Sequence, residues 1–221
     1  DGRYELESVP QCLCGSTLDQ PLASSDRFGI PVRMVMCRAC GLIRTTPRLA
    51  SSALPAFYED DYHGLHMGAP KPKAALYREG QGARVFQKIQ SHLGARRDIS
   101  VYEIGCGAGT VLLELQAEAK QQGYTTRLAG CEYSLAYVAE ARANGVDARH
   151  GGIETLRDDS KPDIIVLSHV VEHFVDIEAE LASIASLCSS DTLVYVEVPG
   201  VMSIHQNEGY EFSLQQYFTL S

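Results

Sequence analysis

The chain has 221 residues, of which 45% are hydrophobic and 21% are charged, and its formal net charge is −9. These values favour a globular protein with a sizeable core over a disordered chain. Residues 1–100 carry 13 Lys and Arg against 10 Asp and Glu, whereas residues 101–221 carry 6 against 18. Because so acidic a second half repels polyanions, nucleic acid is a poor candidate for a partner.

The chain also lacks the patterns of a membrane or secreted protein. No apolar run approaches the roughly 20 residues of a membrane span. The first residues, Asp1 to Glu5, do not show the charged and then apolar layout of a signal peptide. We therefore expect a cytoplasmic protein with three parts, which are residues 1–50, 51–97 and 98–221.

Four of the seven cysteines form two close pairs, Cys12 with Cys14 and Cys37 with Cys40, and a glycine follows each pair. In a reducing compartment such pairs indicate a metal site before disulfides. Four thiolates complete a tetrahedral Zn²⁺ site, which stabilises a segment too small for its own core. We therefore predict a structural, zinc-ribbon-like module over residues 1–50. The first pair departs from the usual spacing, because it is C-x-C, and four unrelated or redox-active cysteines are the alternative.

Residues 51–97 are expected to form a helical connector or lid. Apolar residues at 54–58 indicate a short helix, and those at 85–93 fall on one face of a second helix that Gly94 can end. Tyr62, His63 and Tyr77 are candidates for a lid over a binding site. Their alternative role is aromatic packing and surface polarity.

From residue 98 onward, short apolar runs alternate with helical patterns. Strands are predicted at 99–104, 127–132, 146–150, 163–168 and 192–198, and helices at 111–121, 135–143 and 177–187. This alternation predicts an α/β fold with a Rossmann-like, mostly parallel sheet covered by helices on both faces. Only residues 201–221 follow the last strand, too few for the two strands that usually complete such a sheet, so we expect a fragment of a larger protein.

A glycine-rich loop follows the first of these strands. Gly105, Gly107 and Gly109 alternate with other residues, and a helical pattern begins at Val111. Strand, glycine loop and helix together bring backbone N–H groups to a bound nucleotide. The dinucleotide fingerprint needs a third glycine at the position of Thr110, so this loop favours a different nucleotide. Glu103 lies near the end of the predicted buried strand, and burying its carboxylate costs free energy unless a cation or several hydrogen-bond donors are nearby. The amino group of a sulfonium ligand supplies both the positive charge and the donors.

The second strand of the predicted sheet ends in another acid, Glu132, within Gly130-Cys131-Glu132-Tyr133-Ser134. A carboxylate at this place can accept hydrogen bonds from both hydroxyls of a ribose. The alternative is a surface acid at a strand end. In combination with the glycine loop, ribose binding is the better interpretation.

These motifs resemble those of class I SAM-dependent methyltransferases. The family's first motif, E/D-x-G-x-G-x-G, is matched by Glu103, Gly105, Gly107 and Gly109, and its second by Glu132. The resemblance covers about residues 98–200. It implies that S-adenosyl-L-methionine (SAM) is the cofactor and that Cys106 and Tyr133, next to the matched residues, also line its site.

Two later loops complete the resemblance. In the family, the loop after the third strand lies beside the adenine, which implies contacts from Gly152 and Ile153. The fourth motif follows the fourth strand and corresponds here to residues 168–174, so the resemblance implies that Ser168 and His169 line the cofactor pocket.

The first 97 residues are similar to one branch of this family. The four-Cys module, the connector pattern of Phe57, Tyr58 and Tyr62, and an H-x-x-E-H turn look like sugar methyltransferases that act on nucleotide-linked deoxysugars and related polysaccharide enzymes. In the sugar C-methyltransferases the Glu-His pair lies next to the acceptor carbon, which implies catalytic roles for Glu172 and His173. Quinone O-methyltransferases share this turn, so it does not define the acceptor atom.

The chemistry of methyl transfer makes this pair reasonable independently of the family. The protein must align the nucleophile with the methyl group and remove a proton, a task that suits a histidine positioned by a carboxylate. The alternative is that Glu172 and His173 only cap or pair in the first turn of a helix. We therefore expect a SAM-dependent methyltransferase acting on a sugar or another small polar acceptor. A non-catalytic SAM-binding scaffold, and a methyltransferase acting on a protein or nucleic acid, are the alternatives.

Overall fold

The computed structural model describes residues 3–25, 32–62, 64, 80–157 and 160–198. Their backbone contacts divide them into two units. One unit comprises residues up to Phe57, Glu172–Asp176 and Val198; the other comprises the rest of Tyr58–Val171 and Ile177–Glu197. Each unit is described by itself. The predicted domain boundaries at residues 50 and 97 stay predictions.

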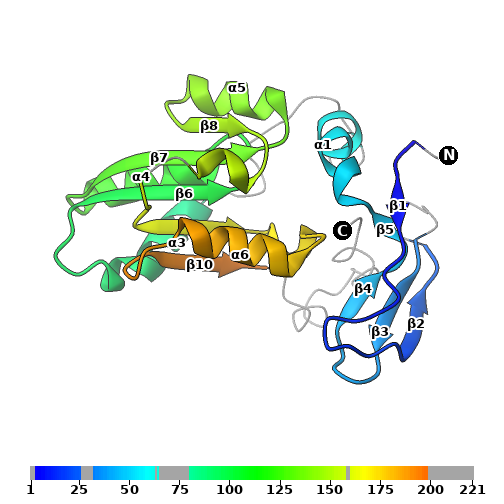
Figure 1. Cartoon of the computed structure of the whole chain (residues 1–221). Helices are drawn as coiled ribbons and strands as arrows, with labels where there is room; N and C mark the ends of the chain where they lie inside the picture. Colours follow the sequence, from blue (N-terminus) through cyan, green and yellow to red (C-terminus); the bar gives the residue numbers. More distant parts are fainter. Residues whose placement is uncertain (1–2, 26–31, 63, 65–79, 158–159, 199–221) are drawn as a thin grey trace, which may run out of the picture. The chain divides into compact units, whose positions relative to one another are not determined.

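The larger unit is built on a five-stranded parallel sheet (Figure 1). Its strands are β6 (Asp98–Ile104), β7 (Thr125–Glu132), β8 (Asp147–His150), β9 (Ile164–Ser168) and β10 (Leu193–Glu197), in the spatial order β10-β9-β6-β7-β8. The strand order reverses beside β6, since β7 lies on one side of it and β9 on the other. In open α/β sheets this is the place where ligands bind, beyond the carboxyl ends of the strands.

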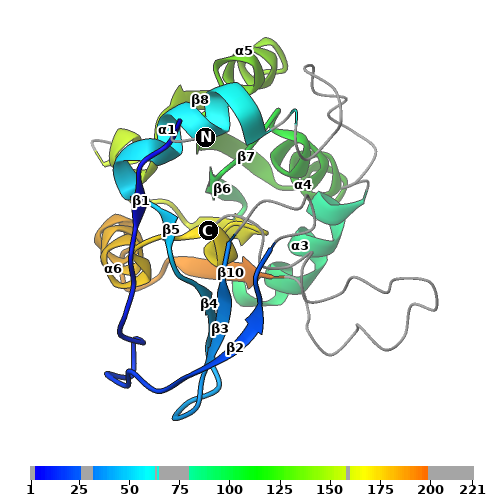
Figure 2. The ribbon, with the colours of Figure 1, turned by 90° about the vertical axis from the view of Figure 1, so that its right-hand side faces the viewer.

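Helices cover both faces of this sheet, as predicted. They are α3 (Gln81–Ile89), α4 (Thr110–Gln121), α5 (Leu135–Ala143) and α6 (Ile177–Leu187), with short 3₁₀ turns η3 (Gln90–His92), η4 (Ile153–Leu156) and η5 (Val171–His173). Figure 2 looks along the sheet and shows α3 and α4 on one side of it and α6 on the other. The alternate residues Ile99, Val101, Ile164 and Val166 point into one apolar core with α3, α4 and α5, and all four are completely buried.

Helix α3 is fastened to α4 at its first turn. Both oxygens of the Glu114 carboxylate accept backbone hydrogen bonds there, one from Gly80 N–H and one from Gly82 N–H, each at 2.9 Å. A Cβ atom at Gly82 would lie 2.1 Å from the carbonyl oxygen of Val111, so the two helices approach too closely for any other residue. This contact sets the position of Gln81, the first residue of α3.

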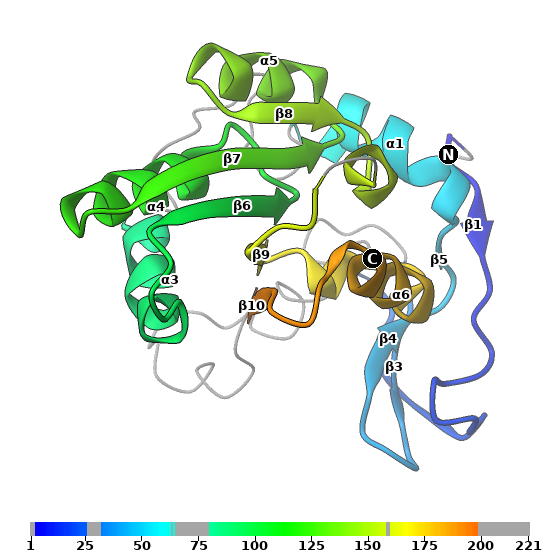
Figure 3. The same ribbon diagram turned by 60° about the vertical axis from the view of Figure 1, so that its left-hand side comes forward.

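The smaller unit contains short strands (Figure 3). An antiparallel sheet of β2 (Asp19–Ala23), β3 (Met34–Cys37) and β4 (Ile43–Thr45) follows the order β2-β3-β4, and β1 (Leu6–Glu7) pairs with β5 (Arg48–Leu49). Next come the 3₁₀ turn η1 (Ser51–Ala53) and helix α1 (Leu54–Phe57). The guanidinium of Arg44 joins β4 to β2 through two hydrogen bonds of 2.8 Å to the Asp19 carboxylate.

The predicted elements correspond closely to those observed in the larger unit, where α5 and α6 have the predicted bounds and each predicted strand agrees within two residues. His63, Tyr77 and residues 201–221 lie outside the described residues. Within the part of the chain that is described, no helix combines the length and the apolar character that a membrane span requires.

Candidate functional site

The glycine loop after β6 has the conformation expected of a nucleotide-binding loop. Gly105, Gly107 and Gly109 all have positive φ values, of 68°, 52° and 80°, in the left-handed region that other residues avoid. A Cβ atom at Gly109 would lie 2.9 Å from Val146 Cγ2, whereas one at Gly107 would meet nothing within 4 Å. Gly109 is thus required by packing beneath the loop, and Gly107 borders open space.

Glu132, at the end of β7, joins this loop to the next one. Its Oε2 accepts a hydrogen bond of 3.0 Å from Gly107 N–H, and its Oε1 accepts one of 2.9 Å from Ser134 N–H. A carboxylate fixed in this way at the end of the second strand of the sheet lies where nucleotide-binding α/β folds receive a ribose.

The loop rests directly on β7, and this contact explains a glycine that the sequence patterns did not single out. A Cβ atom at Gly130 would lie 2.7 Å from Cys106 Cβ and 2.9 Å from the carbonyl oxygen of Glu103. Cys106 is itself buried, and burial, followed by the nearby Glu103 charge, raises the pKa of its thiol. We therefore interpret Cys106 as packing beneath the loop and not as a nucleophile. Glu103 is completely buried in β6, where a carboxylate requires a favourable partner.

Tyr133 and the loop after β8 form the neighbouring part of the site. A Cβ atom at Gly152 would lie 2.7 Å from Tyr133 Oη, so the two predicted residues are packed together. Burial raises the pKa of Tyr133 to about 12. The Glu154 carboxylate accepts a hydrogen bond of 2.8 Å from Gly152 N–H, and Ile153 is buried.

The turn η2 (Tyr58–Tyr62) packs on this region from the connector. Its Tyr58 ring stacks on Tyr133 at a centroid distance of 5.9 Å and lies 4.8 Å from the ring of Tyr62. The Glu59 carboxylate accepts a hydrogen bond of 2.8 Å from Leu135 N–H at the start of α5. Tyr62 is therefore part of an aromatic group beside Tyr133, although its proposed lid partners His63 and Tyr77 are outside the described residues.

The end of β9 carries the predicted residues Ser168 and His169. Ser168 is buried, and its Oγ accepts a hydrogen bond of 2.5 Å from Gln81 Nε2. His169 Nε2 lies 3.7 Å from Glu197 Oε1, at the end of β10. Sequence reasoning missed both Gln81 and Glu197, because residues on different elements meet here and no local motif marks them.

The predicted catalytic residues Glu172 and His173 belong to the turn η5. The Glu172 Oε1 and His173 Nε2 atoms are 4.0 Å apart, and the side chains are 15% and 24% exposed. This geometry makes them an ion pair when the histidine is protonated. Both residues group with the smaller unit.

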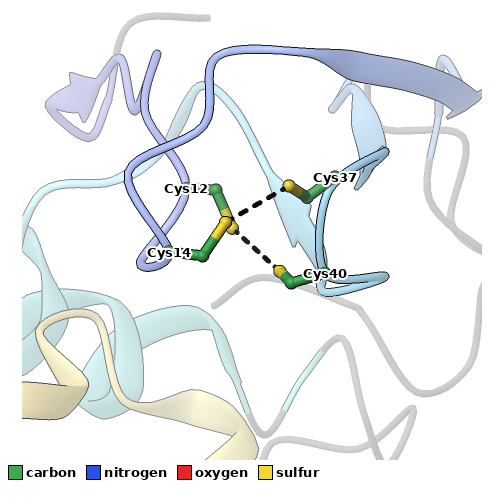
Figure 4. Close-up of side chains that lie close together, drawn as sticks. All are labelled: Cys12, Cys14, Cys37 and Cys40. Carbon is green, nitrogen blue, oxygen red and sulfur yellow. Dashed lines mark hydrogen bonds between the residues drawn. The ribbon is translucent and has the colours of Figure 1, made fainter.

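The four cysteines of the predicted metal site converge (Figure 4). Their sulfur atoms all lie within 4.8 Å of one another, and the Cys12–Cys40 and Cys14–Cys37 sulfurs are 3.6 Å apart. A tetrahedral Zn²⁺ with Zn–S bonds of about 2.3 Å separates its sulfurs by about 3.8 Å. The C-x-C spacing of the first pair is thus compatible with four-sulfur coordination.

The backbone around the cysteines also suits thiolate ligands. Gly15 N–H donates to the carbonyl oxygen of Cys12, and Gly41 N–H donates to that of Cys37, both at 2.8 Å, so each pair lies in a tight turn. The backbone N–H of Cys40 points at the Cys37 sulfur and lowers the pKa of that thiol. The pKa of Cys40 is raised instead: a backbone hydrogen bond from Leu42 lowers it, but hydrogen bonds with Cys14 and Cys12 outweigh that effect. Thiolate is the form that binds zinc.

Comparisons with known proteins agree with this geometry. A family model described as "Methyltransferase domain" matches residues 77–218. Trans-aconitate 2-methyltransferase of Mycobacterium ulcerans is 30% identical over 119 residues, covering 53% of this chain and 43% of that protein. Ubiquinone biosynthesis O-methyltransferase of Rickettsia bellii is 25% identical over 95 residues, covering 42% and 39%. These matches span less than half of the length of either relative.

Solved structures share the fold. The plantazolicin methyltransferase BpumL, in complex with a pentazolic desmethylPZN analog and SAH, aligns with a TM-score of 0.50 at 19% identity. The alignment covers 63% of this chain and 58% of that one. With the family model matching well over half of its residues, this chain belongs to the methyltransferase domain family.

Proposed function

We propose that this protein transfers a methyl group from SAM to a small polar acceptor, most specifically a sugar. The observation that carries this proposal is the Glu132 carboxylate, which Gly107 N–H and Ser134 N–H hold beside the glycine loop at the end of β7, where nucleotide-binding α/β folds place the acid that binds a ribose. The open space over Gly107 supports it, since an added side chain there would meet no protein atom within 4 Å. Relatives named as a trans-aconitate methyltransferase and an O-methyltransferase of ubiquinone biosynthesis also support methyl transfer to a small molecule.

The residues present fit SAM. The loop Gly105–Gly109 and Glu132 would bind its nucleoside, Tyr133, Gly152 and Ile153 would contact its adenine, and Ser168 with His169 would border its other end. When bound, SAM supplies a methyl group on a positively charged sulfur, which is a good leaving group. The protein's contribution is to hold the acceptor in line with that methyl group and to remove a proton.

We propose that Glu172 and His173 assist this proton removal. The carboxylate lies 4.0 Å from the imidazole, an ion-pair distance once the histidine has taken up a proton. The partial exposure of both side chains leaves the histidine accessible to an acceptor.

The four-Cys cluster is proposed to hold a structural Zn²⁺. With four sulfur ligands no coordination position stays open, so the metal would not take part in methyl transfer. We further propose a cytoplasmic location, because none of the seven cysteines, all of which are described, forms a disulfide.

The experiment is a methyl-transfer assay with SAM and a panel of nucleoside-diphosphate sugars, free monosaccharides and trans-aconitate. Release of SAH, together with a mass gain of one methyl group on one sugar, would support the proposal. Methylation of trans-aconitate alone would keep the reaction and reject the sugar. SAH binding without methylation of any acceptor would favour the scaffold alternative.

A further inference from the structure

Residues 132–135 join β7 to α5 and include two residues of the proposed SAM site, Glu132 and Tyr133. The Glu132 carboxylate fastens this segment internally, because its Oε1 accepts a hydrogen bond of 2.9 Å from Ser134 N–H. The Tyr133 hydroxyl lies over Gly152, since a Cβ atom there would be 2.7 Å from Tyr133 Oη. The position of the Tyr133 ring therefore shapes the part of the site that we assign to the adenine.

Two consecutive residues of the turn η2 also hold this segment. The ring of Tyr58 stacks on that of Tyr133, with a centroid distance of 5.9 Å and an angle of 18° between the ring planes. The next residue, Glu59, accepts a hydrogen bond of 2.8 Å from Leu135 N–H at its Oε2. Both contacts lie within the larger unit, which begins at Tyr58. The turn thus grips the segment on either side of Ser134.

The Glu59 contact is a helix cap supplied from a distant part of the chain. Leu135 is the first residue of α5, so its N–H has no acceptor within the helix. Among the described residues, the side chain of Ser134 does not supply this cap. A carboxylate at a helix N-terminus also interacts favourably with the helix dipole. Glu59 therefore fixes the start of α5, two residues after Tyr133.

The Tyr58 ring is supported within its own turn. Tyr62 lies against it at a centroid distance of 4.8 Å. The five residues of η2 form a single π-helical turn, a rare geometry that is frequent at functional sites. A ring packed between Tyr62 and Tyr133 can hold Tyr133 in one orientation.

We propose that Tyr58 and Glu59 are positioning residues of the SAM site, which hold Tyr133 and the start of α5 in the arrangement that receives the adenosine part of the cofactor. The connector is then a component of the cofactor site, and neither residue needs to touch SAM. This proposal rests on the proposed function and adds two residues to the set named there.

The test is calorimetric titration of the full chain with SAH. Tyr58→Leu should weaken SAH binding by about fivefold or more, the size of one aromatic contact, whereas Tyr58→Phe keeps the ring and should bind like the wild type. Tyr124→Leu is the matched control, because Tyr124 packs edge-on against Phe86 at 5.2 Å and precedes β7 at the opposite end of that strand. It should lower the free energy of unfolding and leave the SAH affinity of the folded protein unchanged.

A double-mutant cycle separates positioning from an independent role. If Tyr58 acts through Tyr133, the effects of the two substitutions are not additive. Tyr58→Leu should then weaken SAH binding by less than about twofold in a chain that already carries Tyr133→Leu. Additive losses would overturn the proposal, because Tyr58 would then act independently of Tyr133.

The exposed Glu59 gives a second test that does not depend on the folding of the Tyr58 variants. Glu59→Ala should weaken SAH binding by about threefold or more, as expected for a lost helix cap, whereas Glu59→Gln keeps an acceptor oxygen and should bind like the wild type. Glu178→Ala, which removes an exposed carboxylate from α6, is the control. Unchanged SAH binding in Glu59→Ala, or in a folded Tyr58→Leu variant, would overturn the proposal. Failure of the wild type to bind SAH would instead reject the proposed function.

Discussion

Glu132 accepts hydrogen bonds from two loops, and those two bonds tie the turn after β6 to the start of α5. The sequence predicted Glu132, because an acid that directly follows the second strand of the sheet can be recognised from neighbouring residues alone. Gly130 was not predicted, because its role depends on Cys106, a residue of another loop, lying against it. The same holds for Gln81 and Glu197, which meet Ser168 and His169 only through the folded sheet.

Two glycines of the loop offer a matched comparison of packing and binding. Gly109→Ala should destabilise the fold by about 2 kcal/mol or more, since it combines a left-handed backbone with a Cβ atom 2.9 Å from Val146 Cγ2. Gly107→Ala has no such contact, so it should cost about 1 kcal/mol of stability and mainly weaken SAH binding. Urea unfolding and calorimetric SAH titration of both variants provide the measurement. Equal losses of stability in the two would contradict this distinction.

Burial raises the pKa of Glu197, but hydrogen bonds from Tyr195 and Gln81 and nearby positive charges outweigh it, so the pKa is lowered. This lowered pKa predicts a pH-dependent contribution to stability. Because the folded state favours the carboxylate, the stabilisation is present above the group's ordinary pKa and is lost as the pH falls through the lowered value. Glu197→Gln should therefore lower the free energy of unfolding at pH 7, and its difference from the wild type should shrink in acid. Urea unfolding from pH 7 to pH 3 tests this. A difference in the free energy of unfolding between the two proteins that grew as the pH fell would contradict this prediction.

At the scale of elements, the alternating half of the chain was predicted closely, whereas in the first half the two connector helices were predicted and two strands of the three-stranded sheet were missed. Helices α5 and α6 have the predicted bounds because their patterns are long and end at clear turn signals. Strands β2 and β4 were missed, since Asp19–Ala23 contains Pro21 and lacks apolar alternation, and Ile43–Thr45 has only three residues. Their sheet depends on contacts between segments, including the Arg44–Asp19 pair.

The proposed zinc site of the four-Cys cluster can be tested in this same part of the chain. Metal analysis of the purified protein should find about one zinc per chain. Cys40→Ser should lose the metal and unfold the segment around β3 and β4, because the bound ion supplies much of its folding energy. Cys188→Ser, which changes a partly exposed thiol of α6's C-terminal end, should retain both. A wild type that is free of metal and fully folded over residues 3–57 would refute the zinc proposal.

For the molecule as a whole, the parallel sheet and its covering helices followed from the order of patterns alone. The carboxyl edge of that sheet gathers the glycine loop, Glu132, Tyr133 and the His169–Glu197 pair from separate parts of the sequence. The sequence could place Glu132, Tyr133 and His169 at this edge, because each follows a strand and parallel strands end together. The sequence could not identify the methyl acceptor, because specificity for a substrate depends on side chains that only the fold brings together.

The most direct measurement is isothermal titration of the folded protein with SAH. We expect saturable binding at one site per chain, weakened at least tenfold by Glu132→Ala, which removes the acceptor of both loop hydrogen bonds and the proposed contact with the ribose. The exposed Glu178→Ala should bind as tightly as the wild type. No binding by the folded wild type, or binding that Glu132→Ala leaves unchanged, would contradict it.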